Sequence, residues 1–202
     1  MRNFYAILVA ISVSLFSGNA LAVTVDFDSD YTVINANPSL GLTGEIVSKG
    51  FLFDPLNYWE TDTSFDASDA ASFYSPNSCP PCVGPEFTVT TESGSAFNLA
   101  SVDVRFTDNV SFPGLTVTGY YEGGGTISKI ITDDAWHLET FDSQWTNLSS
   151  VTFEAAGSGC CGGGSIDIDN FTATVVPVPA AVWLFGSALA GLGFLRRRVN
   201  AP

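Results

Sequence analysis

The fold class is decided by the stretch Ala100-Ser101-Val102-Asp103-Val104-Arg105-Phe106-Thr107, in which apolar and polar side chains alternate with a period of two. Successive side chains of a β-strand point to opposite faces of the sheet. The stretch therefore predicts a strand that buries Val102, Val104 and Phe106 and turns Ser101, Asp103 and Arg105 outward.

The same alternation recurs along most of the chain. It predicts further strands at residues 23–28, 44–53, 87–91, 115–121, 126–131, 136–141, 151–155 and 165–175. A turn at Gly123-Gly124-Gly125 joins two of them into a hairpin, although three consecutive glycines leave its register open. Residues 54–85 lack a clear period and are predicted as one long loop. Short strands without an amphipathic helix favour an all-β fold, an antiparallel β-sandwich of the jelly-roll kind.

Residues 23–175 form the predicted folded body, one domain long enough to bury a hydrophobic core. All 21 acidic residues lie in this body, against only Lys49, Arg105 and Lys129, so the body carries a net charge of −18 while the whole chain carries −14. Such a surface repels the phosphates of nucleic acids and of anionic lipids, and it attracts cations. Nucleic acid is therefore not an expected partner.

The first 22 residues have the pattern of a secretory signal peptide. Arg2 gives a positive start, residues 4–16 are mostly apolar, and Ala20-Leu21-Ala22 has the small side chains that signal peptidase reads. We therefore expect export and cleavage after Ala22. An uncleaved anchor is the alternative, but the apolar segment is short for a membrane span.

The end of the chain carries three features in order. Val176-Pro177-Val178-Pro179-Ala180 restricts the backbone to an extended approach. Residues 180–195 then carry only apolar, glycine or serine side chains, and Arg196, Arg197 and Arg198 follow. As a helix the apolar segment would span about 24 Å. The arginines favour retention on the cytoplasmic side, so the pattern predicts a short transmembrane helix with the body outside the inner membrane.

This tail resembles the PEP-CTERM sorting signal of Gram-negative bacteria, in its Val-Pro-x-Pro-Ala variant. The resemblance covers residues 176–198 and implies that an exosortase, a membrane enzyme, recognises the chain and cuts it at the proline motif. It also implies an intermediate anchored in the inner membrane and a final location at the cell surface or outside the cell. A plain tail anchor without processing is the alternative.

Two stretches of the body resemble the late strands of jelly-roll carbohydrate-binding modules and of many exosortase-dependent surface proteins. The first is residues 136–153, in which Leu-Glu-Thr-Phe-Asp lies between two tryptophans and Asn-Leu-Ser-Ser-Val-Thr-Phe forms the end. The second is Ile166-Asp167-Ile168-Asp169-Asn170-Phe171. This resemblance implies a jelly-roll domain that binds carbohydrate.

Four cysteines lie in two predicted loops, Cys79 and Cys82 around two prolines and Cys160 and Cys161 among glycines. An even number of cysteines in an exported chain predicts two disulfides. Bridges between the loops are favoured, because adjacent cysteines pair with each other only through a strained ring. They would close a loop of about eighty residues, worth roughly 4 kcal/mol in the chain-entropy model. A bridge from Cys79 to Cys82, a four-thiolate zinc site and a thiol redox site are alternatives.

Aspartates lie near both ends of the body. Asp26 and Asp28 in the first predicted strand would meet Asp167 and Asp169 in the last if these two strands pair. Carboxylate oxygens are the ligands that Ca²⁺ takes, so a structural calcium ion is one interpretation. Acids on the solvent face of an ordinary strand are the other. No further cofactor is expected.

The sequence carries no recognisable catalytic motif. His137 is its only histidine, and neither Gly-x-Ser-x-Gly nor His-Glu-x-x-His occurs. A glycosidase needs two facing carboxyl groups, but among 21 acids any pair can be nominated. Aromatic faces can stack on sugar rings, and the candidates for such stacking are Trp59, Trp136, Trp145, Tyr120 and Tyr121.

The sequence therefore predicts a non-catalytic surface or extracellular-matrix protein, exported and sorted through its tail, with exopolysaccharide as its candidate ligand. A secreted carbohydrate-active hydrolase with the same tail is the alternative.

Overall fold

The computed structural model describes residues 21–28, 31–34, 45–55, 70–74, 84–107, 114–155 and 164–177. Leu21–Val176 form one compact unit of the chain. Within the described ranges every regular element is a strand, and every strand pairing is antiparallel. The predicted all-β, antiparallel class is confirmed.

The described part of the chain contains twelve strands. They are β1 (Ala22–Val25), β2 (Tyr31–Ile34), β3 (Glu45–Ser48), β4 (Phe51–Pro55), β5 (Ala71–Tyr74), β6 (Glu86–Thr91), β7 (Phe97–Thr107), β8 (Leu115–Tyr121), β9 (Thr126–Ile131), β10 (His137–Thr140), β11 (Leu148–Ala155) and β12 (Ser165–Val175).

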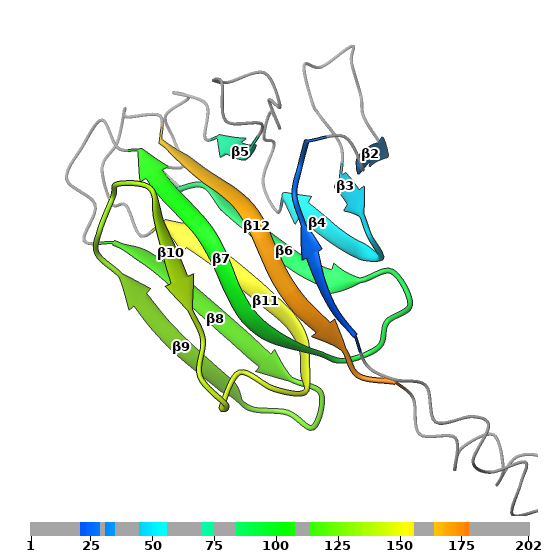
Figure 1. Cartoon of the computed structure of the whole chain (residues 1–202). Coiled ribbons are helices and arrows are strands. Elements are labelled where there is room, and N and C mark those ends of the chain that lie inside the picture. Colours follow the sequence, from blue (N-terminus) through cyan, green and yellow to red (C-terminus); the bar gives the residue numbers. More distant parts are fainter. Residues whose placement is uncertain are drawn as a thin grey trace, which may run out of the picture. The chain divides into compact units, whose positions relative to one another are not determined.

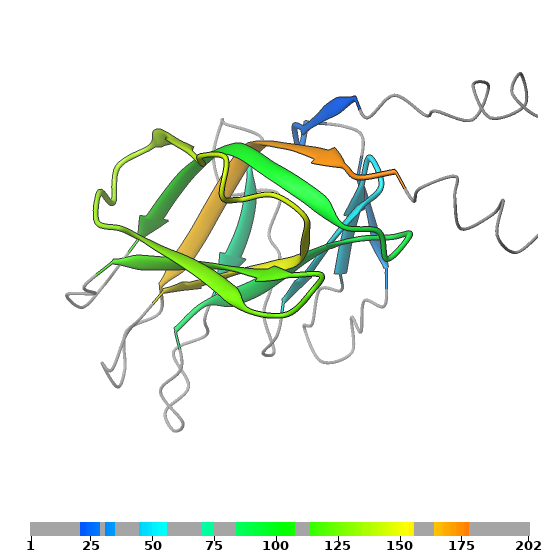
Figure 2. The same ribbon diagram turned by 90° about the horizontal axis from the view of Figure 1, so that it is seen from below.

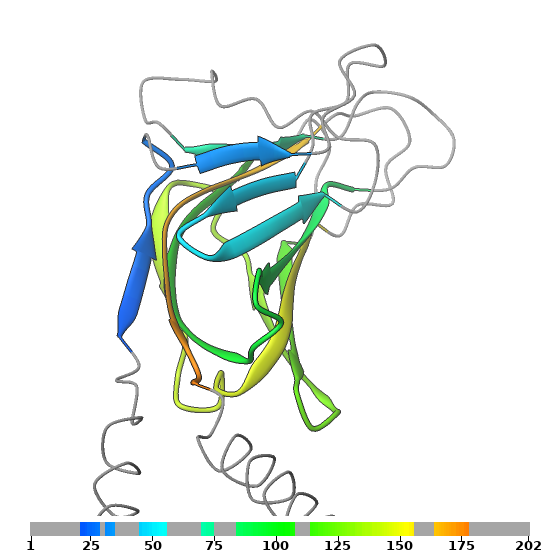
Figure 3. The same cartoon turned by 90° about the vertical axis from the view of Figure 1, so that its right-hand side faces the viewer.

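These strands form one sheet that curls back on itself into two facing layers (Figures 1 and 3). The order of hydrogen-bonded neighbours is β1-β12-β7-β11-β6-β4-β3-β2, with β10 on β7, β5 on β12 and the β8–β9 hairpin on β11. Strands β7 and β11 are joined through the single pair Phe97 and Leu148. One layer therefore holds β1, β5, β7, β10 and β12, and the other holds the remaining strands; Figure 2 shows the two layers facing each other.

Phenylalanine rings fill the space between the layers. Phe51 and Phe53 of β4 each meet Phe171 of β12 edge-on, with ring centroids 5.4 Å apart. At another point Phe73 of β5 stacks on Phe87 of β6 at 3.8 Å. All five rings are completely buried. Because each contact joins strands of opposite layers, the aromatic core holds the curled sheet closed.

The stretch that decided the fold class forms most of β7. Val102 and Val104 are completely buried and Phe106 is 4% exposed, as predicted. The predicted hairpin is also confirmed, and its register runs from Leu115 opposite Ile131 to Tyr120 opposite Thr126. Sequence alternation alone thus located the inner face of these strands.

The prediction of a single strand at residues 44–53 is wrong. The segment folds back on itself as β3 and β4, with a turn at Lys49 and Gly50, whose φ angles are +48° and +85°. Two consecutive residues with positive φ are typical of the tight type I′ turn of a β-hairpin. The buried positions are Ile46 and Ser48 before the turn and Phe51 and Phe53 after it, so no single alternation runs through the segment.

Two strands had not been predicted at all. Strand β5 lies inside the expected long loop, and its residues Ala71, Ser72 and Phe73 are all buried, so its sequence shows no alternation. Strand β2 is largely exposed and pairs with β3. A period of two appears only where one face of a strand is buried and the other is not.

Several predictions fall outside the described residues and stay predictions. They concern Ala20, Trp59, the four cysteines, residues 178–195 and the arginine cluster. Ala22 opens β1, and Val176 and Pro177 follow directly after β12. In the described ranges, no helix has the length and apolar character needed to cross a membrane.

Candidate functional site

A pocket of about 400 Å³ lies at the layer formed by β10, β7 and β12. It is lined by Asp103, Trp136, His137, Leu138 and Asp169. Three of these residues form a row across the sheet, because Asp103 of β7 lies directly opposite Leu138 of β10 on one side and Asp169 of β12 on the other. Residues paired in this way point to the same face. Strand register therefore builds the floor of the pocket.

A β-bulge brings Asn170 to the same row. The register between β12 and β7 shifts after Asp169, and Asn170 has a φ of +46°, a conformation that asparagine tolerates better than most residues. Its side-chain amide donates hydrogen bonds to Oδ2 of Asp103 at 2.9 Å and to Oδ2 of Asp169 at 3.1 Å. One amide thus holds two carboxylates side by side.

Burial raises the pKa of the Asp169 carboxyl group. The neighbouring carboxylates of Asp28 and Asp103 raise this pKa further, while backbone N–H groups of Asn170 and Phe27 lower it. The net change is upward. Among the described residues, neither Asp103 nor Asp169 takes part in a salt bridge. The carboxylates of the pocket therefore lie close together, and no salt bridge from a described basic side chain neutralises them.

Trp136 borders the pocket and is held in place by a charged pair. The guanidinium carbon of Arg105 lies 5.0 Å from the centre of its ring. Arg105 in turn donates from Nε to Oδ2 of Asp167 at 2.9 Å and pairs with the same oxygen through Nη2 at 2.7 Å. The hydroxyl of Ser72 also donates to Asp167, whose residue surface is only 3% exposed. These contacts fix the position of Arg105, and through it that of the ring.

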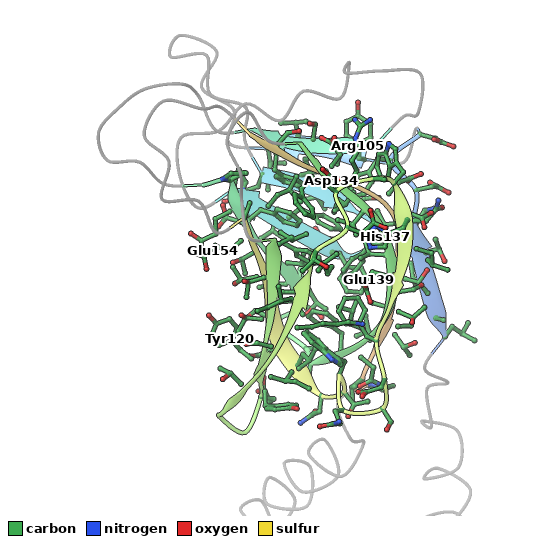
Figure 4. The ribbon with its side chains drawn as sticks, turned by 90° about the vertical axis from the view of Figure 1, so that its left-hand side faces the viewer. Arg105, Tyr120, Asp134, His137, Glu139 and Glu154 are labelled. Atoms are coloured by element: carbon green, nitrogen blue, oxygen red, sulfur yellow. The ribbon has the colours of Figure 1, made fainter. Side chains whose placement is uncertain are left out.

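His137 is bound into the edge of the layer. Its Nδ1 donates to the carbonyl oxygen of Ala135 at 2.8 Å, and its Nε2 lies 3.5 Å from a carboxylate oxygen of Glu139. Glu139 also pairs with Lys129 of β9. Figure 4 shows His137 and Glu139 close together, while Tyr120 and Glu154 lie on the other side of the domain. Neither of these contacts of the histidine is to a nucleophile, so His137 forms no catalytic triad with the residues that the structure describes.

The structure separates the aromatic side chains predicted as sugar platforms. The prediction is wrong for Trp145, which is 3% exposed and packs edge-on against Phe141 with ring centroids 4.7 Å apart. Tyr120 is 41% exposed but belongs to β8 in the other layer. The hydroxyl of Tyr121 donates to the carbonyl of Gln144 at 3.0 Å. Of the four candidates that the structure describes, Trp136 borders the pocket.

The first and last strands do pair, the condition on which a meeting of these aspartates depended, since Val25 of β1 lies opposite Phe171 of β12. The four aspartates named for calcium are not all brought together. Asp26 forms a salt bridge of 3.0 Å with Lys49 and Asp167 pairs with Arg105, whereas Asp28 lies close enough to Asp169 to raise its pKa. Across the described ranges, no three His, Cys, Asp or Glu side chains are arranged to hold a metal ion. Calcium binding stays a prediction.

The sequence did not single out Asp103 and Asn170 as site residues. Asp103 is an outward-facing acid in a regular strand, the most ordinary place for a carboxylate. The role of Asn170 depends on the bulge. Its trace in the sequence is the break in alternation at Asp169-Asn170, where two polar residues follow one another inside a strand.

No protein-family model matches the chain, and no curated protein sequence matches it either. Solved structures with a similar fold include a carbohydrate-binding module of family 29, with a TM-score of 0.42, 16% identity, and 76% of this chain and 88% of that chain covered. A mutant family 29 module in complex with cellulohexaose has a TM-score of 0.41 and 17% identity, with 77% of this chain and 92% of that chain covered. A xylan-binding module of family 22 from Paenibacillus barcinonensis has a TM-score of 0.37 and 13% identity, with 80% of this chain and 99% of that chain covered. These likenesses are too distant to assign a ligand to this chain.

Proposed function

We propose that the domain of residues 21–176 is a non-catalytic carbohydrate-binding module and that the pocket beside Trp136 is its binding site. A sugar ring presents an apolar face and a rim of hydroxyl groups. Trp136 offers a flat apolar surface for the face, and Asp103, Asp169 and Asn170 offer acceptors and donors for the rim.

The observation that carries the proposal is this meeting of an aromatic ring with hydrogen-bonded polar side chains in one pocket. Its volume of about 400 Å³ lies within the usual range of small-molecule sites, roughly 300–1,000 Å³. An ordinary solvent face of a strand needs no such pocket and no amide shared between two carboxylates. The arrangement is what recognition of a polyhydroxylated ligand requires.

Trp136→Ala tests this proposal in the full chain. The wild-type protein is first screened against an array of neutral, acidic and amino-sugar oligosaccharides, and the dissociation constants of the bound ones are measured by calorimetry. We expect Trp136→Ala to weaken binding at least about tenfold, because it removes the apolar area of the ring and a stacking contribution of about 0.5–1.5 kcal/mol beyond that area. Tyr120→Ala, which removes an exposed ring from the other layer, should leave binding unchanged. Equal affinity in wild type and Trp136→Ala would refute the site.

A hydrolase is the second candidate, and one observation favours it. Glycoside hydrolysis uses two neighbouring carboxyl groups, one of them with a raised pKa so that it can donate a proton. Asp103 and Asp169 are held by one amide, and the pKa of Asp169 is raised. Release of reducing ends from an array-positive oligosaccharide, abolished by Asp169→Asn, would establish hydrolysis. Binding without products would support the module.

We further propose that the chain is exported, stapled by disulfides and sorted to the cell surface through residues 176–198. The support comes from the sequence: the signal-peptide pattern, the four cysteines, and the ordered proline, apolar and arginine features. Exopolysaccharide is then the natural ligand class for the module. Mass analysis of the mature protein tests both ends, with Val23 expected first and a C-terminus expected near Val176. Four free thiols in an unreduced digest would refute the disulfides.

A further inference from the structure

We infer that the glycan bound in this pocket carries free amino groups, as polymers of glucosamine do. The inference rests on the proposed carbohydrate-binding function and adds the class of ligand. Its starting point is charge: Asp103 and Asp169 line the pocket, and Asp28 is close enough to influence Asp169.

The basic residues of the body are committed to other carboxylates. Residues 23–175 contain three lysines and arginines in all. Lys49 pairs with Asp26, Arg105 with Asp167, and Lys129 with Glu139. The negative charge of the pocket is therefore left for the ligand to neutralise.

The hydrogen-bonding character of the pocket leads to the same ligand class. Ionised carboxylates accept hydrogen bonds and donate none, so Asp103 and Asp169 need a ligand rich in donors. A protonated amine brings three donors and a positive charge to a partly buried site, where ion pairs are less screened than at an open surface. An N-acetyl group removes the charge, and a uronic acid adds repulsion.

Other titratable groups around the pocket set the expected pH dependence. His137 lines it, the Arg105–Asp167 and Lys129–Glu139 pairs flank it, and Asp133 and Asp134 precede β10. Because burial and neighbouring carboxylates raise the pKa of Asp169, this group gains its proton earlier than an ordinary carboxyl group as the pH falls. The loss of its negative charge weakens attraction for an ammonium group, so affinity for an amino glycan should fall with the pH.

The test compares three hexasaccharides by calorimetry with the full chain, at pH 6.5 and low salt: hexamers of glucosamine, of N-acetylglucosamine and of galacturonic acid. We expect the glucosamine hexamer to bind at least about tenfold more tightly than the acetylated one, and the galacturonic acid hexamer most weakly. The preference should shrink in 0.5 M salt, where the Debye length falls to roughly 4 Å.

Two double variants separate the pocket from the general acidity of the domain. Asp103→Asn/Asp169→Asn should bring the affinity for the glucosamine hexamer close to the affinity for the N-acetylglucosamine hexamer, so that their ratio is near one. Glu122→Gln/Glu154→Gln removes the same number of charges from exposed positions outside the pocket lining and should keep the ratio. An equal loss in both variants, or an acetylated hexamer that binds the wild type as well as the free amine, overturns the inference while the carbohydrate site stands. Failure of all three hexamers and of the array counts against the proposed function itself.

Discussion

Asp167 shows how one buried charge organises its surroundings. A carboxylate that is only 3% exposed is stable in a protein only when it is paired and hydrogen-bonded. Arg105 provides two nitrogens at 2.9 and 2.7 Å, and Ser72 adds a hydroxyl. Because Arg105 also covers Trp136, the pair connects the stability of β12 to the border of the pocket.

Arg105→Met should therefore destabilise the domain strongly. Methionine keeps the apolar stem but leaves Asp167 without its cation, and breaking a buried pair costs about 3 kcal/mol. Urea unfolding measures the change in the free energy of unfolding. Lys49→Met is the matched control, since Lys49 and Asp26 have side chains 28% and 42% exposed and such a pair contributes only about 0.5 kcal/mol. Equal losses in the two variants would contradict the role given to Asp167.

The β8–β9 hairpin is tightly packed at its open end, where Gly114 lies against the backbone of Ile131. Gly114 precedes β8 with a φ of +140°, and a Cβ atom there would lie 2.5 Å from the carbonyl oxygen of Ile131. Gly114→Ala must therefore move backbone, which we expect to cost about 2 kcal/mol. Gly123→Ala, in the turn at the other end of the hairpin, meets nothing within 4 Å. It should change stability by less than about 0.5 kcal/mol in the same thermal unfolding experiment. Similar melting temperatures would contradict this account.

Strands were predictable from the sequence where one face is buried and the other is exposed to solvent. This holds for the central part of β7 and for β8 and β9, whose positions the alternation gave correctly. It does not hold for β5, where Phe73 and both preceding residues are buried. It also fails for residues 44–53, where the buried positions shift from Ile46 and Ser48 to Phe51 and Phe53 across the turn.

The site was predictable only in part, because it depends on pairing between distant strands. Trp136 was one of the candidates for stacking on sugar rings, and Asp169 was one of the candidate calcium ligands. Asn170 and Asp103 are 67 positions apart in the chain, and they meet through the register of β12 on β7 and a bulge. Alternation tells which face a residue occupies but not which residue lies opposite it.

The acidity of the domain lowers its free energy of unfolding by an amount that depends on pH. Burial raises the pKa of Asp54, Glu86 and Asp169, and nearby carboxylates add to each shift. For Glu86 the neighbour is Glu154, directly opposite on β11. The folded state then holds these protons more tightly than the unfolded chain. The cost is absent below the ordinary pKa of a carboxyl group and grows as the pH rises through the raised values.

The domain should therefore be more stable at pH 5 than at pH 7.5, with a melting temperature higher by roughly 2–4 °C. Added salt should raise the melting temperature at pH 7.5 more than at pH 5, because it screens repulsion among ionised acids. Calorimetric scans of the full chain at the two pH values and two salt concentrations measure both effects. A melting temperature that rises from pH 5 to pH 7.5 would contradict the prediction.

The pairing of β1 with β12 also decides how the domain carries mechanical load. Ala22 lies opposite Thr174, so the chain enters and leaves at the same end of one antiparallel pair. A pull between these two ends opens the pair like a zipper, one hydrogen bond after another. A pull between Asp103 of β7 in the pocket and Val175 of β12 would instead slide these two strands along each other. That load is shared by many bonds in shear, so the domain resists tension on its pocket better than tension on its ends.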